Sequence, residues 1–393
     1  MTEVKQERLW RPEFIFLLAI NVINFSGFGM ITPQIPRFAV SLGATLAAAG
    51  VLVSIFSFSA LVGRPFASAL GDRLNKKHLL IAALVLNGFF TVLHAFIPGI
   101  GWLIPLRVIH GLIFSVSGTL AIALSVDYIP KSRIGEGVGF LGLGNIIGMA
   151  LGPNLGIFVV DNFDFQINFV VSGLVILSSG LAVLLLRYKA SEPMQEKSPK
   201  RRFRLSDLIA IELLPNVLFV AMFMLCTGLV NSFLVMLGYD RGILNVGVYF
   251  LINSLIAVLT RPTIGKLVDR KGSAFVILPG YISAAIGMLI IGFASSLWHL
   301  LIAAVFVSIG IGCGLPSIQA DCLKRLDASR RTVATGTYFI GLDIGMFVGP
   351  LAGGAIIGAF GFQTAFTSAT VLLLFGFVAY LIYSRTKIEK TTD

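Results

Sequence analysis

The sequence is divided into long stretches without a charged residue, each about long enough to cross a lipid bilayer. A spanning helix needs about 20 apolar residues, and the first stretch, Phe14 to Pro36, has 23. Comparable stretches cover 38–63, 79–106, 108–126, 137–160, 165–186, 213–239 and 242–260. Two longer regions, 272–320 and 332–384, each accommodate two spans, with breaks expected near 294–296 and 358–361. The pattern predicts an all-α membrane protein with twelve transmembrane helices, because the stretches are too long for barrel strands.

Composition excludes several classes of protein. Hydrophobic residues make up 56% of the chain, charged residues only 12%, and the mean hydropathy is +0.91. Soluble domains carry about a quarter charged residues, so an ordinary soluble enzyme, a disordered chain and a nucleic-acid-binding chain are all excluded. The first stretch is longer than the apolar core of a signal peptide and lacks a small-residue cleavage site, so we expect it to remain as a span. The three cysteines lie in apolar stretches and predict no disulfide framework.

The distribution of Lys and Arg predicts the orientation in the membrane. Twenty-five of the 30 basic residues lie in alternate loops and at the termini, within residues 5–11, 73–77, 131–133, 187–204, 266–271, 324–331 and 385–390. The loops on the opposite side carry only Arg37 and Arg241. Because positive residues concentrate on the cytoplasmic side, we expect a multi-pass protein of the cell membrane with both termini in the cytoplasm. Trp102 and Trp298 then lie at the outer interface, where aromatic residues are enriched.

The two halves of the sequence repeat each other with an offset of 197 residues. Matches include Arg64-Pro65 with Arg261-Pro262, Asp72-Arg73 with Asp269-Arg270, and Gly152-Pro153 with Gly349-Pro350. We therefore predict two pseudo-symmetric six-helix halves, residues 1–187 and 208–393, joined by a basic cytoplasmic linker at 188–207. The linker is either a solvated connection or a segment that docks on anionic lipid. A parallel repeat with the substrate between the halves is typical of transporters.

Three motifs resemble those of the major facilitator superfamily. The loop at 68–77 (SALGDRLNKK) is similar to the family signature G-x-L-a-D-r-x-G-r-r, with Ser68 and Asn75 in place of its glycines. Residues 103–111 contain Arg107 followed by His110-Gly111, where the family usually has Gln before Gly. The glycine-rich helix at 139–156 resembles the signature of drug:proton antiporters, except that Ile157 replaces its last glycine. The resemblance covers nearly the whole chain and implies an exporter that works by alternating access.

The glycine-rich helix and its repeat are predicted to be gating helices. The first copy spaces its glycines four residues apart, so they share one helix face and permit close approach of a neighbouring backbone. The proline within each copy removes a backbone hydrogen bond and permits a bend. A static packing face is the alternative. The residues concerned are Gly144, Gly148, Gly152, Pro153 and Gly156, with Gly345, Gly349, Pro350 and Gly353 in the second half.

A cytoplasmic gate is predicted at the repeated Asp-Arg pairs. A carboxylate at this position can neutralise a helix N-terminus or pair with an arginine. The resemblance implies that Asp72 contacts the second glycine-rich helix and holds the cytoplasmic side closed, with Asp269 as its counterpart. The alternative is that these charges simply mark the cytoplasmic face. The predicted gate consists of Asp72, Arg73, Arg133, Asp269 and Arg270.

Ionisable residues within the predicted spans are scarce. A charge at this depth costs about 2.5–3.5 kcal/mol or more, so it marks a pathway or a partner. We predict Asp343 and His110 as proton-coupling residues. For the substrate cavity we predict Arg107, His110, Asn21, Asn24 and Asn253. Fixed hydrogen bonds between helices are the alternative for the asparagines and the histidine, and a structural contact is the alternative for Asp343.

These observations together predict a secondary transporter and no enzyme. The sequence has no G-x-x-x-x-G-K-[ST] loop for ATP and no close-spaced metal-ligand cluster, so no cofactor or metal is expected. We expect proton-coupled efflux of small amphipathic molecules or metabolites, such as drugs or metal-chelating compounds, with lipid and protons as the other partners. The first span lacks a carboxylate, which favours neutral, zwitterionic or weakly acidic substrates. A proton-coupled nutrient importer is the alternative transporter, and a transport-dead receptor or scaffold is the alternative of another class. The resemblance implies a monomer.

Overall fold

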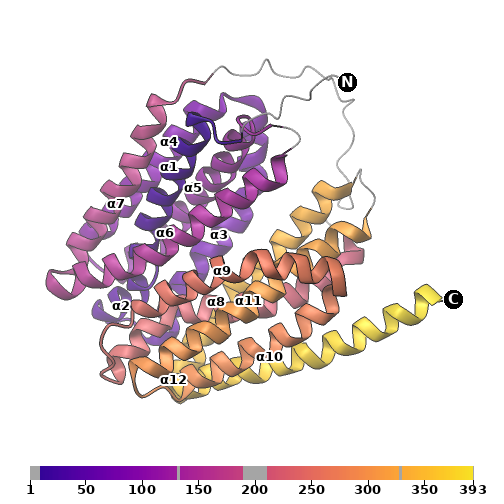
Figure 1. The fold of residues 1–393 in the computed structure, drawn as a ribbon. Coiled ribbons are helices and arrows are strands. Elements are labelled where there is room, and N and C mark those ends of the chain that lie inside the picture. The colour runs from indigo at the N-terminus through magenta and orange to yellow at the C-terminus, as the bar shows by residue number, and fades with distance from the viewer. Residues whose placement is uncertain (1–8, 131–132, 189–209, 327–329, 393) are drawn as a thin grey trace. The chain divides into compact units, whose positions relative to one another are not determined.

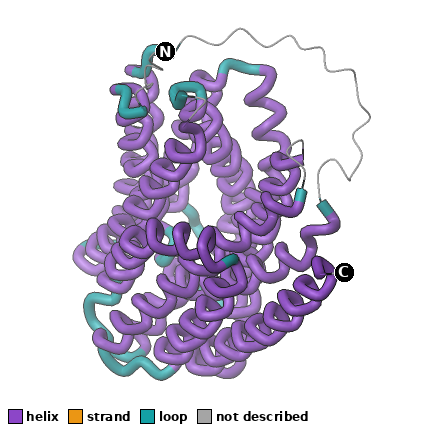
Figure 2. The backbone as a smooth tube through the Cα atoms, turned by 45° about the vertical axis from the view of Figure 1, so that its right-hand side comes forward, coloured by secondary structure: helices purple, strands orange, loops and turns teal. Residues whose placement is uncertain are grey.

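The computed structural model describes residues 9–130, 133–188, 210–326 and 330–392, and the described chain is helical with short connections (Figure 1, Figure 2). Within these described ranges, ten helical segments are long and apolar enough to cross a membrane. The first part of the chain forms α1 (Pro12–Ile31), α2 (Gln34–Ser41), α3 (Leu46–Arg73), α4 (Lys76–Leu93), η1 (His94–Phe96), α5 (Ile100–Val126), α6 (Ile134–Asn162), α7 (Phe165–Ala182) and η3 (Val183–Leu185). The second part forms η5 (Ile211–Leu213), α8 (Leu214–Asp240), α9 (Val248–Lys271), α10 (Ser273–Gly292), α11 (Leu297–Arg325) and α12 (Arg331–Thr392).

Two elements differ from an uninterrupted span. In α9 only Val248–Arg261 is apolar, which is shorter than the other candidate spans. In α12 the backbone of Gly361 has φ +84°, so α12 consists of two helical segments that meet at this glycine. A positive φ is accessible to glycine at little cost. The break lies within the predicted interval 358–361.

The ends of several helices differ from the charge-free stretches of the sequence. The first stretch does not form one helix, because α1 ends at Ile31 before Pro33, and the short α2 follows. The next helix, α3, begins at Leu46 instead of residue 38 and continues to Arg73. Arg107, which separates two charge-free stretches, lies inside α5. A single charged residue therefore does not end a helix here, whereas Pro33 and the turn at Gly43 (φ +89°) do.

The helices group into two compact units. Unit 1 comprises Met1–Gln34 and Ser59–Lys197, and unit 2 comprises Ile35–Phe58 and Ser198–Asp393. The helix α3 is therefore divided, because its residues up to Phe58 pack with unit 2. The predicted linker at 188–207 lies outside the described residues except for Tyr188.

Each unit has its own pattern of helix packing. In unit 1, α1 packs on α6 and α7, and α4 packs on α5 and α7. An apolar cluster of Leu17, Ile20, Leu80, Leu84, Leu120 and Leu124 joins α1, α4 and α5. In unit 2, α8 packs on α12, α10 packs on α11 and α12, and α11 packs on α9. Lipid chains are as apolar as leucine, so the helix contacts depend on close packing, which the glycine faces described below provide.

Candidate functional site

The glycine face of α6 packs against α1. A Cβ atom added at Gly148 would lie 2.6 Å from the Cβ of Phe25, and one at Gly152 would lie 2.7 Å from the Cα of Gly29. Such distances are shorter than real Cβ atoms allow, so only glycine permits this contact. The predicted smooth helix face therefore exists in unit 1 and is filled by the backbone of α1.

The corresponding face of α12 packs against α8 in the same way. A Cβ atom at Gly345 would lie 2.5 Å from the Cβ of Met224, and one at Gly349 would lie 3.1 Å from the Cα of Leu225. Both glycine helices thus make their closest contacts inside their own unit. Pro153 and Pro350 each lie within a continuous stretch of helix. These contacts support the packing role, and a gating role stays a prediction.

Two of the predicted cavity residues lie on α1. Asn21 donates from Nδ2 to the carbonyl oxygen of Leu141 (3.0 Å) and to Oδ1 of Asn145 (2.5 Å), both on α6. Its amide group is therefore engaged in joining the two helices. Asn24 is buried, and its Oδ1 has no hydrogen-bond partner. Of the two, Asn24 retains an acceptor for another group.

Arg107 and His110 lie one turn apart on α5, and both are buried, with Arg107 4% exposed. His110 Nε2 is 2.7 Å from Oδ1 of Asn87 and 3.3 Å from Oγ1 of Thr91, so α5 is bonded to α4 at this point. The ring of His94 lies 5.3 Å from that of His110. Unit 1 thus contains a group of five polar side chains on α4, η1 and α5, namely Asn87, Thr91, His94, Arg107 and His110. Figure 1 shows where α4 and α5 lie in unit 1.

Sequence reasoning missed three members of this group. Asn87, Thr91 and His94 follow one another at i, i+4 and i+7, which places them on one face of α4 and η1. Polar residues with this spacing in a charge-free stretch were the available signal. His94 Nδ1 donates to the carbonyl oxygen of Phe90 (2.8 Å), because a carbonyl only accepts.

The remaining intramembrane residues lie in unit 2. Asp343 is 9% exposed and lies on the part of α12 that packs on α8, between Gly341 and Gly345. Asn253 on α9 donates from Nδ2 to the carbonyl oxygen of Ala304 on α11 (3.3 Å). The structure therefore assigns Asn21, Asn24, Arg107 and His110 to unit 1 and Asp343 and Asn253 to unit 2.

The predicted cytoplasmic gate is described only in part. The side chains of Asp72, Arg73 and Asp269 lie outside the described atoms, although their backbones belong to α3 and α9. Arg270 is exposed in the last turn of α9. Arg133 forms an ion pair with Glu136 at 2.7 Å, and the hydrogen bond from Arg133 lowers the pKa of Glu136. Arg133 is thus engaged with its own helix.

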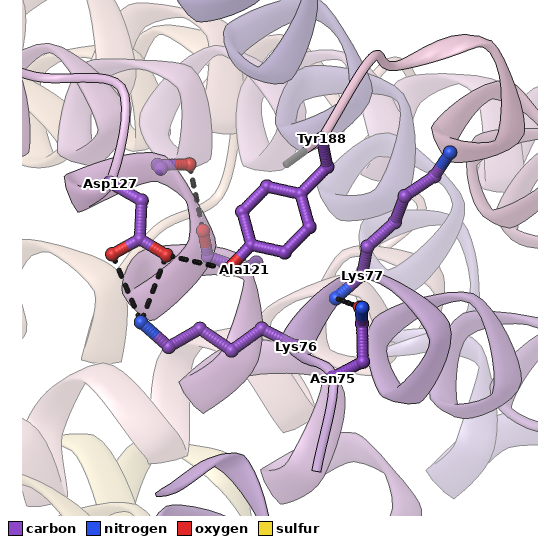
Figure 3. Close-up of polar contacts among 7 residues, drawn as sticks. Asn75, Lys76, Lys77, Ala121, Asp127 and Tyr188 are labelled. Carbon is purple, nitrogen blue, oxygen red and sulfur yellow. Dashed lines mark hydrogen bonds and ion pairs between the residues drawn. The ribbon is translucent and has the colours of Figure 1, made fainter. Parts of the chain in front are cut away.

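A network at one end of unit 1 was not predicted (Figure 3). Lys76 Nζ lies 2.9 Å from both carboxylate oxygens of Asp127, and the hydroxyl of Tyr188 donates to the same carboxylate at 3.0 Å. Asn75 Oδ1 accepts hydrogen bonds from the backbone N–H groups of Lys77 and His78 and so caps α4. The network joins the start of α4, the end of α5 and the chain after η3. We call this end, where α7 leads to residues 189–209, the linker end of unit 1.

The linker-end network changes the acidity of its tyrosine. Partial burial, followed by the hydrogen bond to Asp127, raises the pKa of Tyr188 to about 12. Lys76 and Lys77 were expected only to mark the cytoplasmic face. Lys77 Nζ also donates to the carbonyl oxygens of Leu184 (3.0 Å) and Leu186 (2.7 Å). Every group of this network therefore has a partner within unit 1.

Among the described residues, no group of three or more His, Cys, Asp or Glu side chains is arranged to hold a metal ion. The polar groups of the interior include no nucleophile paired with a base within the hydrogen bonds described above.

Known proteins resemble this chain along its whole length. It is 25% identical to the multi-drug resistance efflux pump PmrA of Streptococcus pneumoniae, over 99% of both chains. It is also 25% identical to the multidrug resistance protein MdtG of Escherichia fergusonii, over 98% of this chain and 96% of the relative. An uncharacterized MFS-type transporter of Methanocaldococcus jannaschii is 22% identical, over 94% of this chain and 98% of the relative.

Solved structures share the fold. A mutant of the nucleoside transporter NupG superposes with a TM-score of 0.79 at 15% identity, covering 93% of this chain and 99% of that one. A bacterial homologue of the lysosomal transporter Spinster gives 0.77 at 17% identity, covering 95% and 96%. The family model for the Major Facilitator Superfamily matches residues 17–291 and 217–393. The chain therefore belongs to the major facilitator superfamily and is a membrane transporter, not an enzyme.

Proposed function

We propose that the protein is a proton-coupled secondary transporter that exports small amphipathic molecules by alternating access. The observation that carries the direction is the full-length similarity to two proteins named as multidrug resistance transporters. The repeated glycine-proline helix, present as α6 and α12, is consistent with it. The similarity to NupG shows the fold alone, and a proton-coupled nutrient importer remains the second candidate.

The proposed architecture has twelve spans in two six-helix halves, 1–187 and 208–393. The ten apolar segments lead to this number when α9 is counted as a span and α12 is divided at Gly361. We place both termini and the linker 188–207 in the cytoplasm of a cell that carries the protein in its cell membrane as a monomer. On this proposal the linker end of unit 1 and the corresponding end of unit 2 face the cytoplasm.

The proposed coupling residue is Asp343, with His110 as a second titrating group. Asp343 is a carboxylate in the apolar part of a membrane helix, and such a residue is retained at a cost that function explains. Arg107, His110, Asn24 and Asn253 are proposed to face the substrate during part of the cycle, together with Asn21. The gate residues Asp72, Arg73, Arg133, Asp269 and Arg270 are proposed to act at the cytoplasmic side.

The direction of transport is tested by comparing metabolites in the medium and the cytosol of cells with and without the protein. An exporter depletes its substrate from the cytosol and enriches it in the medium. Accumulation in the cytosol of energised cells contradicts export and supports the importer. If no compound changes, and proteoliposomes show no flux of any compound that binds, a receptor or scaffold is the better description.

The orientation is tested with single cysteines at Ser198 and Thr391 in a variant without Cys226, Cys313 and Cys322. We expect a membrane-impermeant maleimide to label both positions only from the cytoplasmic side. Labelling of either one from outside contradicts the proposed topology. The gate is tested with Asp72→Asn, which we expect to shift the protein towards the inward-open state. Unchanged transport and unchanged labelling of cavity cysteines contradict the gate.

A further inference from the structure

The end of unit 2 that corresponds to the linker end of unit 1 contains an acid and a base that do not satisfy each other. Asp321 on α11 is buried and accepts a hydrogen bond from Oγ of Ser273, the first residue of α10, at 2.5 Å. Arg325 lies one turn further along α11. Its Nε and Nη2 atoms are buried and have no hydrogen-bond partner. The carboxylate is therefore bound by a hydroxyl group, while this side of the guanidinium retains its hydrogens.

The unpartnered atoms of Arg325 form one edge of the guanidinium group. Nε–H and an Nη2–H point in the same direction and match two oxygens of one oxyanion, which is the geometry of bidentate binding. The ring of Tyr383 lies 4.9 Å from the guanidinium carbon and restricts its orientation. An ammonium group at this position would lack this two-pronged geometry.

A second buried donor belongs to a residue that is bonded to Tyr383. The Tyr383 hydroxyl donates to Oδ1 of Asn216 at 3.1 Å. Asn216 is 0% exposed, and its Nδ2 has no hydrogen-bond partner. Two residues joined through one tyrosine thus both have buried donors to spare. Buried donors are costly when unpaired, the more so on a charged group.

In unit 1, the polar side chains at the corresponding place in the repeat are paired with one another. With the repeat offset of 197, Ser273 corresponds to Lys76, Lys324 to Asp127, and Arg325 to Tyr128. In unit 1, Lys76, Asp127 and Tyr188 pair with one another (Figure 3). In unit 2, Ser273 takes the place of Lys76, Lys324 that of Asp127 and Arg325 that of Tyr128. The aligned positions of unit 2 thus carry two basic residues and no acid, and the buried donors of Arg325 have no hydrogen-bond partner.

We propose that Arg325 and Asn216 bind a phosphate-type oxyanion at this end of unit 2. The ligand is either the phosphate group of an anionic phospholipid or free inorganic phosphate. Asp321 repels an anion, so a singly charged phosphodiester fits better than a dianion. Bound there, the oxyanion joins α8 and α11 next to Tyr383 of α12. Nothing in the transport proposal requires this site, so each can fail without the other.

Two binding measurements on the full-length protein test the site and separate the two sources. In the first, protein in detergent is incubated with equal amounts of phosphatidylglycerol and phosphatidylcholine, and retained lipid is measured by native mass spectrometry. In the second, inorganic phosphate is titrated by calorimetry into protein in phosphatidylcholine nanodiscs. Retention of phosphatidylglycerol over phosphatidylcholine identifies a lipid, and saturable phosphate binding identifies a soluble anion.

The variants Arg325→Gln and Lys324→Gln remove the same charge from adjacent positions. We expect Arg325→Gln to weaken binding of the oxyanion at least tenfold, and Lys324→Gln, whose side chain is exposed, to change it less than twofold. Arg325→Lys keeps the charge without the two-pronged edge and is expected to fall between them. Equal losses in the Arg325→Gln and Lys324→Gln variants overturn the proposal. A wild-type protein that neither prefers phosphatidylglycerol nor binds phosphate overturns it as well, whether or not the variants fold.

Discussion

The helices α6 and α12 occupy equivalent places in the repeat, and their differences are more informative than their similarities. Both present glycines that allow the backbone of α1 or α8 to approach within contact distance. Two of the positions at which they diverge concern us here: Ile146 corresponds to Asp343, and Ile157 corresponds to Gly354. Shared residues thus provide packing that each half needs separately. The residues that differ are candidates for tasks that only one half performs.

The second difference has a visible structural reason. A Cβ atom at Gly354 would lie 2.9 Å from the Cα of Gly50 and 2.6 Å from the carbonyl oxygen of Leu46, both in the first half of α3. The rings of Phe58 and Phe347 also meet, with centroids 5.5 Å apart. Within unit 2, the glycines of α12 therefore contact α8 through one glycine face and α3 through Gly354.

The largest effect is expected from removing the charge of Asp343, which α6 lacks at the corresponding position, Ile146. Asp343→Asn should abolish transport driven by a pH gradient while substrate binding persists, because the variant side chain cannot take up and release a proton. Flux of an exported compound in proteoliposomes, with and without a pH gradient, measures this. Asp240→Asn at the exposed end of α8 is the control and should transport normally. Full gradient-driven transport by the Asp343→Asn variant would eliminate this residue as the coupling site.

The next largest effect is expected from making α12 resemble α6 at its second difference. Gly354→Ile should lower the free energy of unfolding by about 3 kcal/mol, because the added side chain collides with backbone atoms that cannot rotate away. The reciprocal Ile157→Gly should cost about 1 kcal/mol through helix propensity. Thermal unfolding in detergent compares the two. Equal stability losses would mean that α3 and α12 do not make the contact described.

A smaller and equal effect is expected in both helices from the shared glycines. Gly148→Ala and Gly345→Ala should each destabilise by about 1–3 kcal/mol through overpacking. Gly139→Ala and Gly336→Ala, which also correspond in the repeat, have open space around the added Cβ. These two should be neutral or stabilising by about 0.5–1 kcal/mol, since alanine is the better helix former. A tolerated Gly345→Ala would show that α8 and α12 are not in close contact.

The smallest effect concerns the linker end of unit 1. Asp127→Asn should lower the pKa of Tyr188 from about 12 towards its ordinary value of 10.0, although not fully, because burial is the larger cause. Absorbance of the ionised tyrosine during alkaline titration measures this, with Tyr188→Phe to assign the signal. The folded protein binds this proton more tightly than the unfolded chain, so the contribution to stability is complete below pH 10.0 and is lost as the pH rises through about 12. An unchanged titration would mean that Asp127 and Tyr188 do not interact.

The sequence was sufficient for an all-helical membrane protein and for several helix ends. The break between α10 and α11 lies at Phe293–Ser296, and the break in α12 lies at Gly361, both where small and polar residues interrupt the apolar pattern. The predicted start of α3 was wrong, because a turn that contains no charged residue is not visible in the charge pattern. That turn lies at Gly43, whose positive φ is not visible in the charge pattern.

The polar contacts were beyond the reach of the sequence. Asn21 and Asn253 were predicted to face a cavity or to bond between helices, and their amide groups donate to Asn145 and Ala304 of neighbouring helices. Periodicity shows which face of a helix a residue occupies but not which helix lies opposite. His110 was selected for its rarity within a span, whereas its partner Asn87 is an ordinary residue whose role emerges only from the packing of α4 on α5.

The contact between Gly50 and Gly354 has a consequence for how the chain is made. The two residues are separated by 304 positions, so the ribosome completes the first long before the second exists. At about 5–20 residues per second, the first half of α3 waits roughly 15–60 seconds for the partner against which it packs. During that interval its glycine face is exposed to lipid or to the insertion machinery. The packing of the first half of α3 is therefore completed late in synthesis. It depends on residues near the end of the chain and not only on those of the first half.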